Sequence, residues 1–562
     1  DATRHVTQRS WDRQSRLDTS TDRYAQTTEH DYDAQDNRTG RTDPAGHPVF
    51  QPDRLNRLRG VQPAGEGAIA LEYTPAGRIK AQTFPNGASA SYAYDAAGRI
   101  DSITHRQTGT VTATLSYAYD LNGNRSRQTQ VSPAGTRSTT YTYDRDDRLT
   151  GTELTDEAGL VTRTVYTLDD VGNRLTEQVT RAGTTLADKT YSYNARHQLT
   201  QRSDSVGNLT TTYSYDANGF QTSETTNGQT TTYRPNLQDR LATLTTPTGP
   251  PVEYSYDPDG LRVEKRSPSE AVRYGYDGTS LRHETNVTNN PLATYDWAAG
   301  RVLRTHRTGL TSYAQHDALK SPIRWSRADG AEQGRASYDA WGNATSQTGT
   351  LPPIGYTGYY ADSESGNYYA QQRYYQPGIG RFNRIDPWAG NTTHPITLNK
   401  YLYGNGNPLS YVDPDGRCGV FASAMPFTCD RFDGALIGAD PGTLDGQLRL
   451  ATYRFEHGNA LAGRAVDGVV GLVRTFADAS VGLREQITGE NFGASARLKA
   501  QGGAAADYLG NLPVNAIDGF VDWQFALQRA RQSGSLEKVA DATAAPYELG
   551  IGAVVPGGLL AK

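Results

Sequence analysis

The fold of this chain is decided by a short motif, whose clearest copy, at residues 92–100, is YAYDAAGRI. Because side chains alternate along a strand, Tyr92 and Tyr94 face the same side of a sheet. The next four residues, Asp-Ala-Ala-Gly at 95–98, place Asp first and Gly fourth, as a tight turn prefers. The segment after the turn, residues 99–104, is again strand-like. Each copy of the motif therefore predicts one β-hairpin.

The motif recurs every 20 to 25 residues, a period typical of repeat arrays. Other clear copies begin at Tyr117, Tyr141, Tyr166, Tyr191, Tyr213, Tyr254 and Tyr274. Consecutive hairpins make one long antiparallel ribbon, and the right-handed twist of strands bends such a ribbon into a spiral. We expect residues from about 70 to 350 to form it. The repeated tyrosines have a structural interpretation, ring packing between units, and an alternative one, contact with carbohydrate.

The composition agrees with a mainly β protein that has a large polar surface. Hydrophobic residues make up 36% of the 562 residues, and 35 Tyr stand against 12 Phe, so most aromatic side chains carry a polar end. The net charge of -5 is too small to indicate a nucleic-acid partner. The sequence contains no run of eighteen apolar residues, so we expect no membrane span. The two cysteines, Cys418 and Cys429, are too few for a disulfide framework.

A second kind of sequence occupies residues 355–416, where tyrosines are dense and Gly, Pro and Asn recur every few residues. This pattern predicts short strands joined by tight turns. Its most distinctive elements are RYYQP at 373–377, GRF at 380–382, DP at 386–387 and DPDG at 413–416.

These elements, in this order, resemble the RHS-repeat-associated core of the RHS/YD-repeat family of polymorphic bacterial toxins. The residues that carry the resemblance are Arg373, Tyr374, Tyr375, Gly380, Arg381, Phe382 and Pro387. The resemblance implies a hollow shell of β-hairpin repeats (residues 1–354), closed by the core (355–416) and followed by a variable C-terminal region (417–562). It also implies synthesis in a bacterial cytoplasm and delivery outside the cell.

In this family the core resembles an aspartic protease that cuts its own chain just after a DPxGL motif. Asp386 matches the first catalytic aspartate, but the expected place of the second holds Ile396, Thr397 and Leu398. Asp413 and Asp415 are alternative partners, although both belong to the segment that would be cut. The candidate junction, Gly416-Arg417, has Arg in place of Leu. Because acid–base hydrolysis needs two carboxyl groups, we expect the chain to stay intact.

The core's arginines, Arg373, Arg381 and Arg384, are expected to stack on aromatic rings or pair with Asp386. We expect no cofactor and no metal site, because His394 has no second histidine nearby.

The region after Gly416 changes to Ala, Gly, Leu and Val, with an apolar stripe at helical spacing across residues 464–490. It predicts a few helices. No HExxH, GxSxG or HxE with CxxC is present, so no toxin active site is recognised there.

Three functions are consistent with these features. The first is a delivery shell around a C-terminal toxic polypeptide, its own cargo, with a secretion-system component, chaperone or immunity protein as further partners. The second is a surface adhesin that binds carbohydrate through its repeats. The third is a self-cleaving, aspartic-protease-like module. The first is favoured because the core lies where the repeats end and the composition changes.

Overall fold

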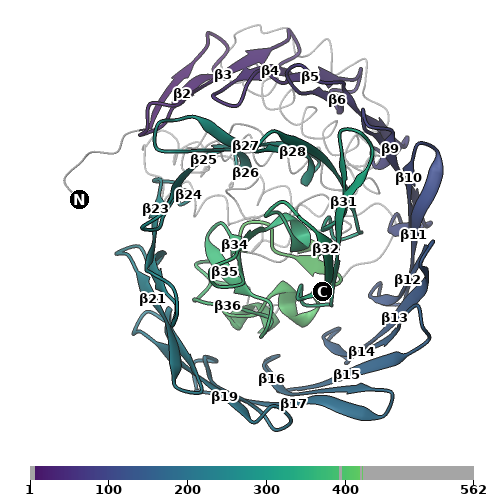
Figure 1. Cartoon of the computed structure of the whole chain (residues 1–562), viewed down its shortest axis with the longest axis vertical. Coiled ribbons are helices and arrows are strands. Elements are labelled where there is room, and N and C mark those ends of the chain that lie inside the picture. Colours follow the sequence, from purple (N-terminus) through teal and green to yellow (C-terminus); the bar gives the residue numbers. More distant parts are fainter. Residues whose placement is uncertain (1–6, 391–394, 418–419, 422–562) are drawn as a thin grey trace, which may run out of the picture. The chain divides into compact units, whose positions relative to one another are not determined.

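A computed structural model describes residues 7–390, 395–417 and 420–421, which all belong to one compact unit (Figure 1). The helices predicted after Gly416, both cysteines and His394 lie outside the described residues. Within them, no helix has the length and apolar character that a membrane crossing needs.

Thirty-two strands form a single antiparallel sheet in which each strand pairs with the next one in sequence. The first half of the sheet consists of β1 (Gln8–Trp11), β2 (Leu17–Thr21), β3 (Thr27–Tyr32), β4 (Arg38–Thr42), β5 (Val49–Pro52), β6 (Leu58–Gln62), β7 (Ile69–Tyr73), β8 (Ile79–Thr83), β9 (Ala88–Tyr94), β10 (Ile100–Gln107), β11 (Thr110–Tyr119), β12 (Arg125–Ser132), β13 (Gly135–Tyr143), β14 (Leu149–Thr155), β15 (Val161–Leu168) and β16 (Arg174–Arg181).

The second half consists of β17 (Thr184–Tyr193), β18 (Leu199–Asp204), β19 (Leu209–Tyr215), β20 (Gln221–Thr226), β21 (Gln229–Pro235), β22 (Leu241–Thr245), β23 (Val252–Tyr256), β24 (Arg262–Arg266), β25 (Ala271–Asp277), β26 (Ser280–Thr285), β27 (Pro291–Ala298), β28 (Arg301–Arg307), β29 (Leu310–His316), β30 (Pro322–Arg327), β31 (Glu332–Tyr338) and β32 (Ala344–Gly349). The predicted hairpin ribbon is confirmed, and it begins earlier in the chain than residue 70.

The motif forms the hairpin as the sequence predicts. In the copy at 92–100, the Gly98 amide donates to the Asp95 carbonyl at 2.9 Å, which closes the turn. Gly98 has φ +79°, a conformation that glycine adopts without steric cost. The Asp95 carboxylate accepts from the Arg99 amide at 2.9 Å and from its Nε at 2.7 Å, so this side chain holds the far side of the turn.

The repeat tyrosines have two separate structural roles. The first tyrosine of the motif is buried: Tyr92, Tyr117, Tyr191 and Tyr254 are each 5% exposed. The second donates its hydroxyl to a backbone carbonyl of the preceding unit, as Tyr94 does to Ile79 at 2.7 Å. The rings therefore join neighbouring units, which supports the structural interpretation of these residues.

The ribbon curves until its later strands pack against its first ones, so that β27 contacts β6 and β29 contacts β9 (Figure 1). Ion pairs cross this overlap. Arg304 pairs with Glu66, and the side chains of Arg38 and Arg41 pair with Asp277. The Asn86 amide donates to the Ser326 hydroxyl at 2.8 Å. These partners are about 240 residues apart, which is the length of one round of the spiral.

The core follows as a small four-stranded antiparallel sheet of β33 (Tyr360–Asp362), β34 (Asn367–Ala370), β35 (Arg373–Gln376) and β36 (Arg381–Phe382). Short 3₁₀ turns are η1 (Tyr356–Gly358), η2 (Pro395–Leu398) and η3 (Gly404–Gly406), and a strand pair is β37 (Tyr411–Val412) with β38 (Val420–Phe421). In Figure 1 this sheet lies within the curve of the ribbon. The core's aromatic rings pack mostly in tilted arrangements, with Tyr368 and Tyr375 stacked, and the Tyr375 and Tyr403 centroids are 4.3 Å apart.

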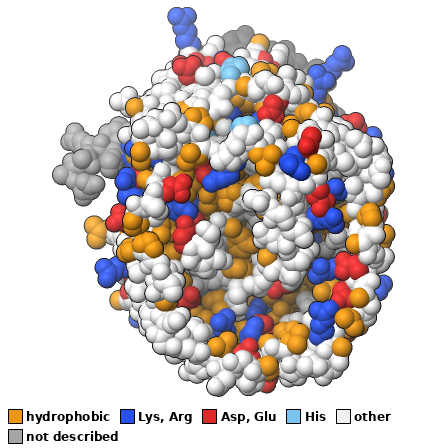
Figure 2. Space-filling model, in the orientation of Figure 1, with side chains coloured by type: hydrophobic (Ala, Val, Ile, Leu, Met, Phe, Trp, Pro, Cys, Tyr) orange, Lys and Arg blue, Asp and Glu red, His pale blue; other side chains and the backbone are white. Residues whose placement is uncertain are grey.

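On the face seen in Figure 2, hydrophobic side chains line the central hollow and also lie on the rim, and charged side chains of both signs are scattered over the face. This face therefore shows no single-sign field, in agreement with the small net charge.

Candidate cleavage site around Arg373

The core is attached to the ribbon through the motif's turns. The Asn407 amide donates to the Asp147 carbonyl at 2.8 Å, the Asn399 amide to the Val171 carbonyl at 3.0 Å and the Tyr401 hydroxyl to the Gly219 carbonyl at 2.8 Å. The same kind of bond joins Arg381 to His197, Arg384 to Asp239, Gln372 to Asp259 and Gln371 to Thr279. Because all the motif turns lie on one edge of the ribbon, the core bridges that edge.

The core's central cation is Arg373, the first residue of β35, which is 2% exposed. Its Nη2 lies 2.8 Å from the Oδ2 of Asp386 and 2.8 Å from the Oδ2 of Asp413. Its guanidinium carbon is 3.6 Å from the centroid of the Phe382 ring. The structure thus brings together two predicted site residues, Asp386 and Asp413, that are 27 positions apart in the chain.

The candidate junction is bound by the same cluster. Arg373 Nε donates to the Gly416 carbonyl at 2.5 Å. The Arg417 amide donates to Asp413 Oδ1 at 2.9 Å and to Asp415 Oδ1 at 3.2 Å. Both sides of the Gly416-Arg417 peptide bond are therefore held, the carbonyl by a cation and the N–H by carboxylates.

Only glycine fits at the junction. Gly416 has φ +73°, and a Cβ there would lie 2.5 Å from the Ala370 carbonyl oxygen. The Gln372 amide donates to the Asp415 carbonyl at 3.1 Å, which holds the segment alongside the β34–β35 turn. The DPDG turn is consequently fixed against the core sheet rather than free at its surface.

Burial alters the acidity of two of the carboxyl groups. It raises the pKa of Asp386 to about 6, although the Arg373 charge opposes the change. Burial, reinforced by the nearby Asp413 carboxylate, raises the pKa of Asp415 to about 7. Removing a carboxyl group from water disfavours its charged form, so both can exchange a proton near neutral pH.

The remaining core residues have structural contacts. Tyr374 accepts from Arg262 Nη1 at 3.1 Å, and the Tyr375 hydroxyl donates to the Trp341 carbonyl at 2.6 Å. Arg381 stacks on Tyr193 at 5.0 Å. Gly380 takes a left-handed conformation, with φ +67°, and Pro387 lies exposed in a bend.

The place at which the sequence predicts a second acid is η2. There Ile396 packs its Cδ1 near Gly172 on the ribbon, so this segment anchors the core to a turn. The sequence predicted that Arg373 stacks on a ring or pairs with Asp386, and it does both, but no spacing in the sequence indicates its second ion pair, with Asp413. No group of three or more His, Cys, Asp and Glu side chains is placed to hold a metal ion within the described ranges.

Comparison with known families gives two matches. The teneurin YD-shell family matches residues 114–409, more than half of the chain, and the RHS repeat matches residues 73–110. The resemblance found in the sequence is thereby confirmed.

Individual relatives are much longer than this chain. The tRNA3(Ser)-specific nuclease WapA of Bacillus spizizenii is 34% identical over 262 residues, which cover 45% of this chain and 11% of WapA. Toxin protein Tse5 of Pseudomonas aeruginosa is 25% identical over 388 residues, which cover 65% of this chain and 26% of Tse5.

Among solved structures, the crystal structure of TcdB2-TccC3-TEV superimposes with a TM-score of 0.56 at 21% identity. The superposition covers 70% of this chain and 21% of that one. It shows a shared fold.

Proposed function

Because the chain belongs to the teneurin YD-shell family, we propose that it is the shell of a toxin-delivery protein, which encloses a C-terminal toxic polypeptide and protects it until delivery. The targets would be competing bacteria or a host. The relatives support this proposal, since one is named a toxin and another a nuclease.

The observation that carries the proposal is the attachment of the core to successive turns along one edge of the ribbon. A ribbon used as an open adhesive array needs no such closing element. The adhesin alternative also needs accessible aromatic rings, whereas the first tyrosine of most motif copies is buried. Because the core closes one edge of the ribbon, we favour a container over an open adhesive array.

The partners follow from this role. We propose that the principal partner is the chain's own C-terminal cargo, and that a secretion-system component, a chaperone or an immunity protein acts before or after delivery. The protein would be made in a bacterial cytoplasm and act outside the cell. We also propose the division into repeats (1–354), core (355–416) and variable region (417–562).

Limited proteolysis of the whole protein tests enclosure. A protease added to the native protein is expected to leave residues 430–562 uncut for as long as the ribbon survives. The same protease added after urea treatment should digest that region at once, which controls for a lack of cleavage sites. Rapid loss of residues 430–562 while the ribbon stays whole would refute the enclosure.

One observation favours a second candidate, self-cleavage at Gly416-Arg417. The carbonyl of this peptide bond is bound by Arg373, and Asp386 reaches the same guanidinium. In this scheme Asp386 takes a proton from water, and the water oxygen bonds to the Gly416 carbonyl carbon. The cation stabilises the negative charge that develops on the carbonyl oxygen.

The bond between carbon and nitrogen then breaks as Asp415 gives a proton to the Arg417 nitrogen. The products are a Gly416 carboxylic acid and an Arg417 amine, the water is consumed, and the proton that Asp386 took replaces the one that Asp415 gave. Because Asp386 must be ionised and Asp415 protonated, the rate should be highest between about pH 6 and about pH 7.

Denaturing electrophoresis of freshly purified protein tests self-cleavage. The sequence predicts an intact chain instead. Fragments that meet near residue 417, absent in Asp386→Asn and present in the exposed control Asp101→Asn, would establish cleavage. A single band near 61.2 kDa, kept after long incubation at pH 6.5, would exclude it.

A further inference from the structure

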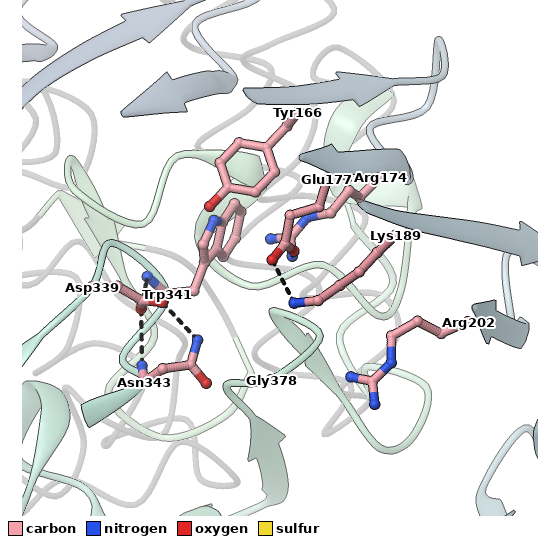
Figure 3. A pocket seen from close by; sticks show the side chains of 9 residues that line it. All are labelled: Tyr166, Arg174, Glu177, Lys189, Arg202, Asp339, Trp341, Asn343 and Gly378. Atoms are coloured by element: carbon pink, nitrogen blue, oxygen red, sulfur yellow. Dashed lines mark hydrogen bonds and ion pairs between the residues drawn. The ribbon is translucent and has the colours of Figure 1, made fainter. Parts of the chain in front are cut away.

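A cavity of about 280 Å³ lies between the ribbon and the turn that follows β31 (Figure 3). Its ribbon side is formed by Tyr166, Arg174, Glu177, Lys189 and Arg202, and its other side by Asp339, Trp341, Asn343 and Gly378. It is separate from the Arg373 cluster, with which it shares no lining residue. At about 30 Å³ for each water in the liquid, the volume holds a small organic anion or a phosphate with its hydration water.

The acids of this cavity are already supplied with hydrogen bonds. Glu177 accepts from Arg174 at 2.6 Å, from Lys189 at 2.7 Å and from the Tyr191 hydroxyl at 2.9 Å. Asp339 accepts from the Asn343 side chain at 2.8 Å and from two backbone amides. Burial raises the pKa of Asp339, because removal from water disfavours the charged form of a carboxyl group. Neither acid has need of a further donor.

The side chains that line the cavity carry more hydrogen-bond donors than there are acceptors to receive them. Lys189 carries three N–H groups and Arg202 five, while Glu177 takes one from Lys189, and the Thr211 hydroxyl takes one from Arg202 at 3.4 Å. The indole N–H of Trp341 is buried and makes no hydrogen bond of ordinary geometry with the described residues, although the Tyr166 hydroxyl lies close to it. Three cationic side chains therefore face a space that contains two satisfied acids.

We infer that this cavity is an oxyanion-binding site, which takes a carboxylate or phosphate group between Lys189, Arg202 and the Trp341 N–H. An oxyanion supplies the acceptor oxygens and negative charge that the walls lack, and hydrogen bonds between ionised groups are the stronger kind. The Tyr166 and Trp341 rings, which meet edge to face at 6.2 Å, provide an apolar wall for the carbon part of a carboxylate. The anion is either an acidic side chain or a free phosphate.

Isothermal titration calorimetry of the whole protein with inorganic phosphate and with glutarate tests the site. We expect saturable binding of at least one anion, with one site per chain. Tighter glutarate binding assigns the site to an acidic side chain, and tighter phosphate binding to the free ion. Arg202→Gln should weaken binding at least tenfold, whereas Arg163→Gln, which removes an exposed charge from β15, should leave it unchanged.

A second variant leaves every charge in place. Gly378 has no positive φ, and a Cβ there would lie 4.0 Å from Arg202 Nη1, so Gly378→Leu puts a side chain into the cavity. This variant should also lose binding, with an unchanged circular dichroism spectrum. The inference is overturned if neither anion binds saturably, or if binding survives both Arg202→Gln and Gly378→Leu.

Discussion

Replacement of His105 by leucine should remove part of the protein's sensitivity to acid. His105 lies on β10, is fully buried, and has no hydrogen-bond partner for either ring nitrogen among the described residues. Across the overlap, the Gln315 side chain donates to the Arg106 carbonyl at 3.2 Å, and His316 is equally buried. A proton on His105 would place a charge between two layers of the spiral.

The difference in the pKa of His105 between the folded and unfolded chain sets the sign and size of this effect on stability. Burial lowers the pKa of His105 to about 4 from the 6.5 of an exposed histidine. The unfolded chain therefore binds the proton first, and the free energy of unfolding falls as the pH drops from about 6.5 to about 4. The loss is about 2 kcal/mol at pH 5 and about 3 kcal/mol below pH 4, because each pKa unit corresponds to about 1.4 kcal/mol.

The assay is equilibrium urea denaturation at pH 8 and pH 5, followed by tryptophan fluorescence. The quantity compared is the loss of unfolding free energy between the two pH values, which should be about 2 kcal/mol smaller in His105→Leu than in the parent protein. Ile103→Leu, a buried change two residues away on the same strand, controls for repacking and should leave that loss unaltered. Equal losses in the parent protein and His105→Leu would refute the reasoning.

Three further predictions concern stability and share the urea assay at pH 8. Asp362→Ala should cost about 3 to 5 kcal/mol, because it leaves the Arg262 charge, 1% exposed and 2.6 Å from that carboxylate, unpaired; a cost below about 1 kcal/mol would contradict this. Tyr356→Phe removes one buried hydroxyl and should lower the free energy of unfolding by about 1 kcal/mol. Tyr356→Ala also removes the ring and should lower it by about 3 to 5 kcal/mol. Equal losses in the two variants would argue against a packed ring. Gly219→Ala should cost more than Gly109→Ala, since both have positive φ but only the first Cβ would meet an atom, at 2.4 Å; the reverse order would count against the close approach of the core.

The sequence predicted those parts of the fold that depend on neighbouring residues. The Asp-x-x-Gly turns form because each supplies a first-position acceptor and a glycine with positive φ, as at Asp216 and Gly219. The paired tyrosines face one side because strand geometry requires it. Neither feature depends on residues far away in the chain, so one copy of the motif was enough to predict both.

The overlap between the late and early strands of the ribbon, and the cluster around Arg373, could not be predicted from neighbouring residues. The distance along the chain between Arg38 and Asp277 depends on how much each hairpin twists, and small differences accumulate over many strands. Likewise Asp413 reaches Arg373 because the DPDG segment folds back on the β34–β35 turn. The expected acid near Thr397 was sought by sequence position, whereas the carboxylate beside Arg373 comes from a segment further along the chain.

The period of the repeat and the length of one round together explain why the core can bridge one edge of the ribbon. With a turn about every 23 residues and about 240 residues to a round, roughly ten motif turns lie along that edge before the ribbon overlaps itself. Turns from residue 147 to residue 279 each offer a carbonyl to the core. These carbonyls come from the third or fourth residue of each turn, so the core meets a row of closely equivalent acceptors. Its Asn, Gln, Arg and Tyr side chains supply donors to match that row, which is why a segment with little regular structure can be held firmly along so long an edge.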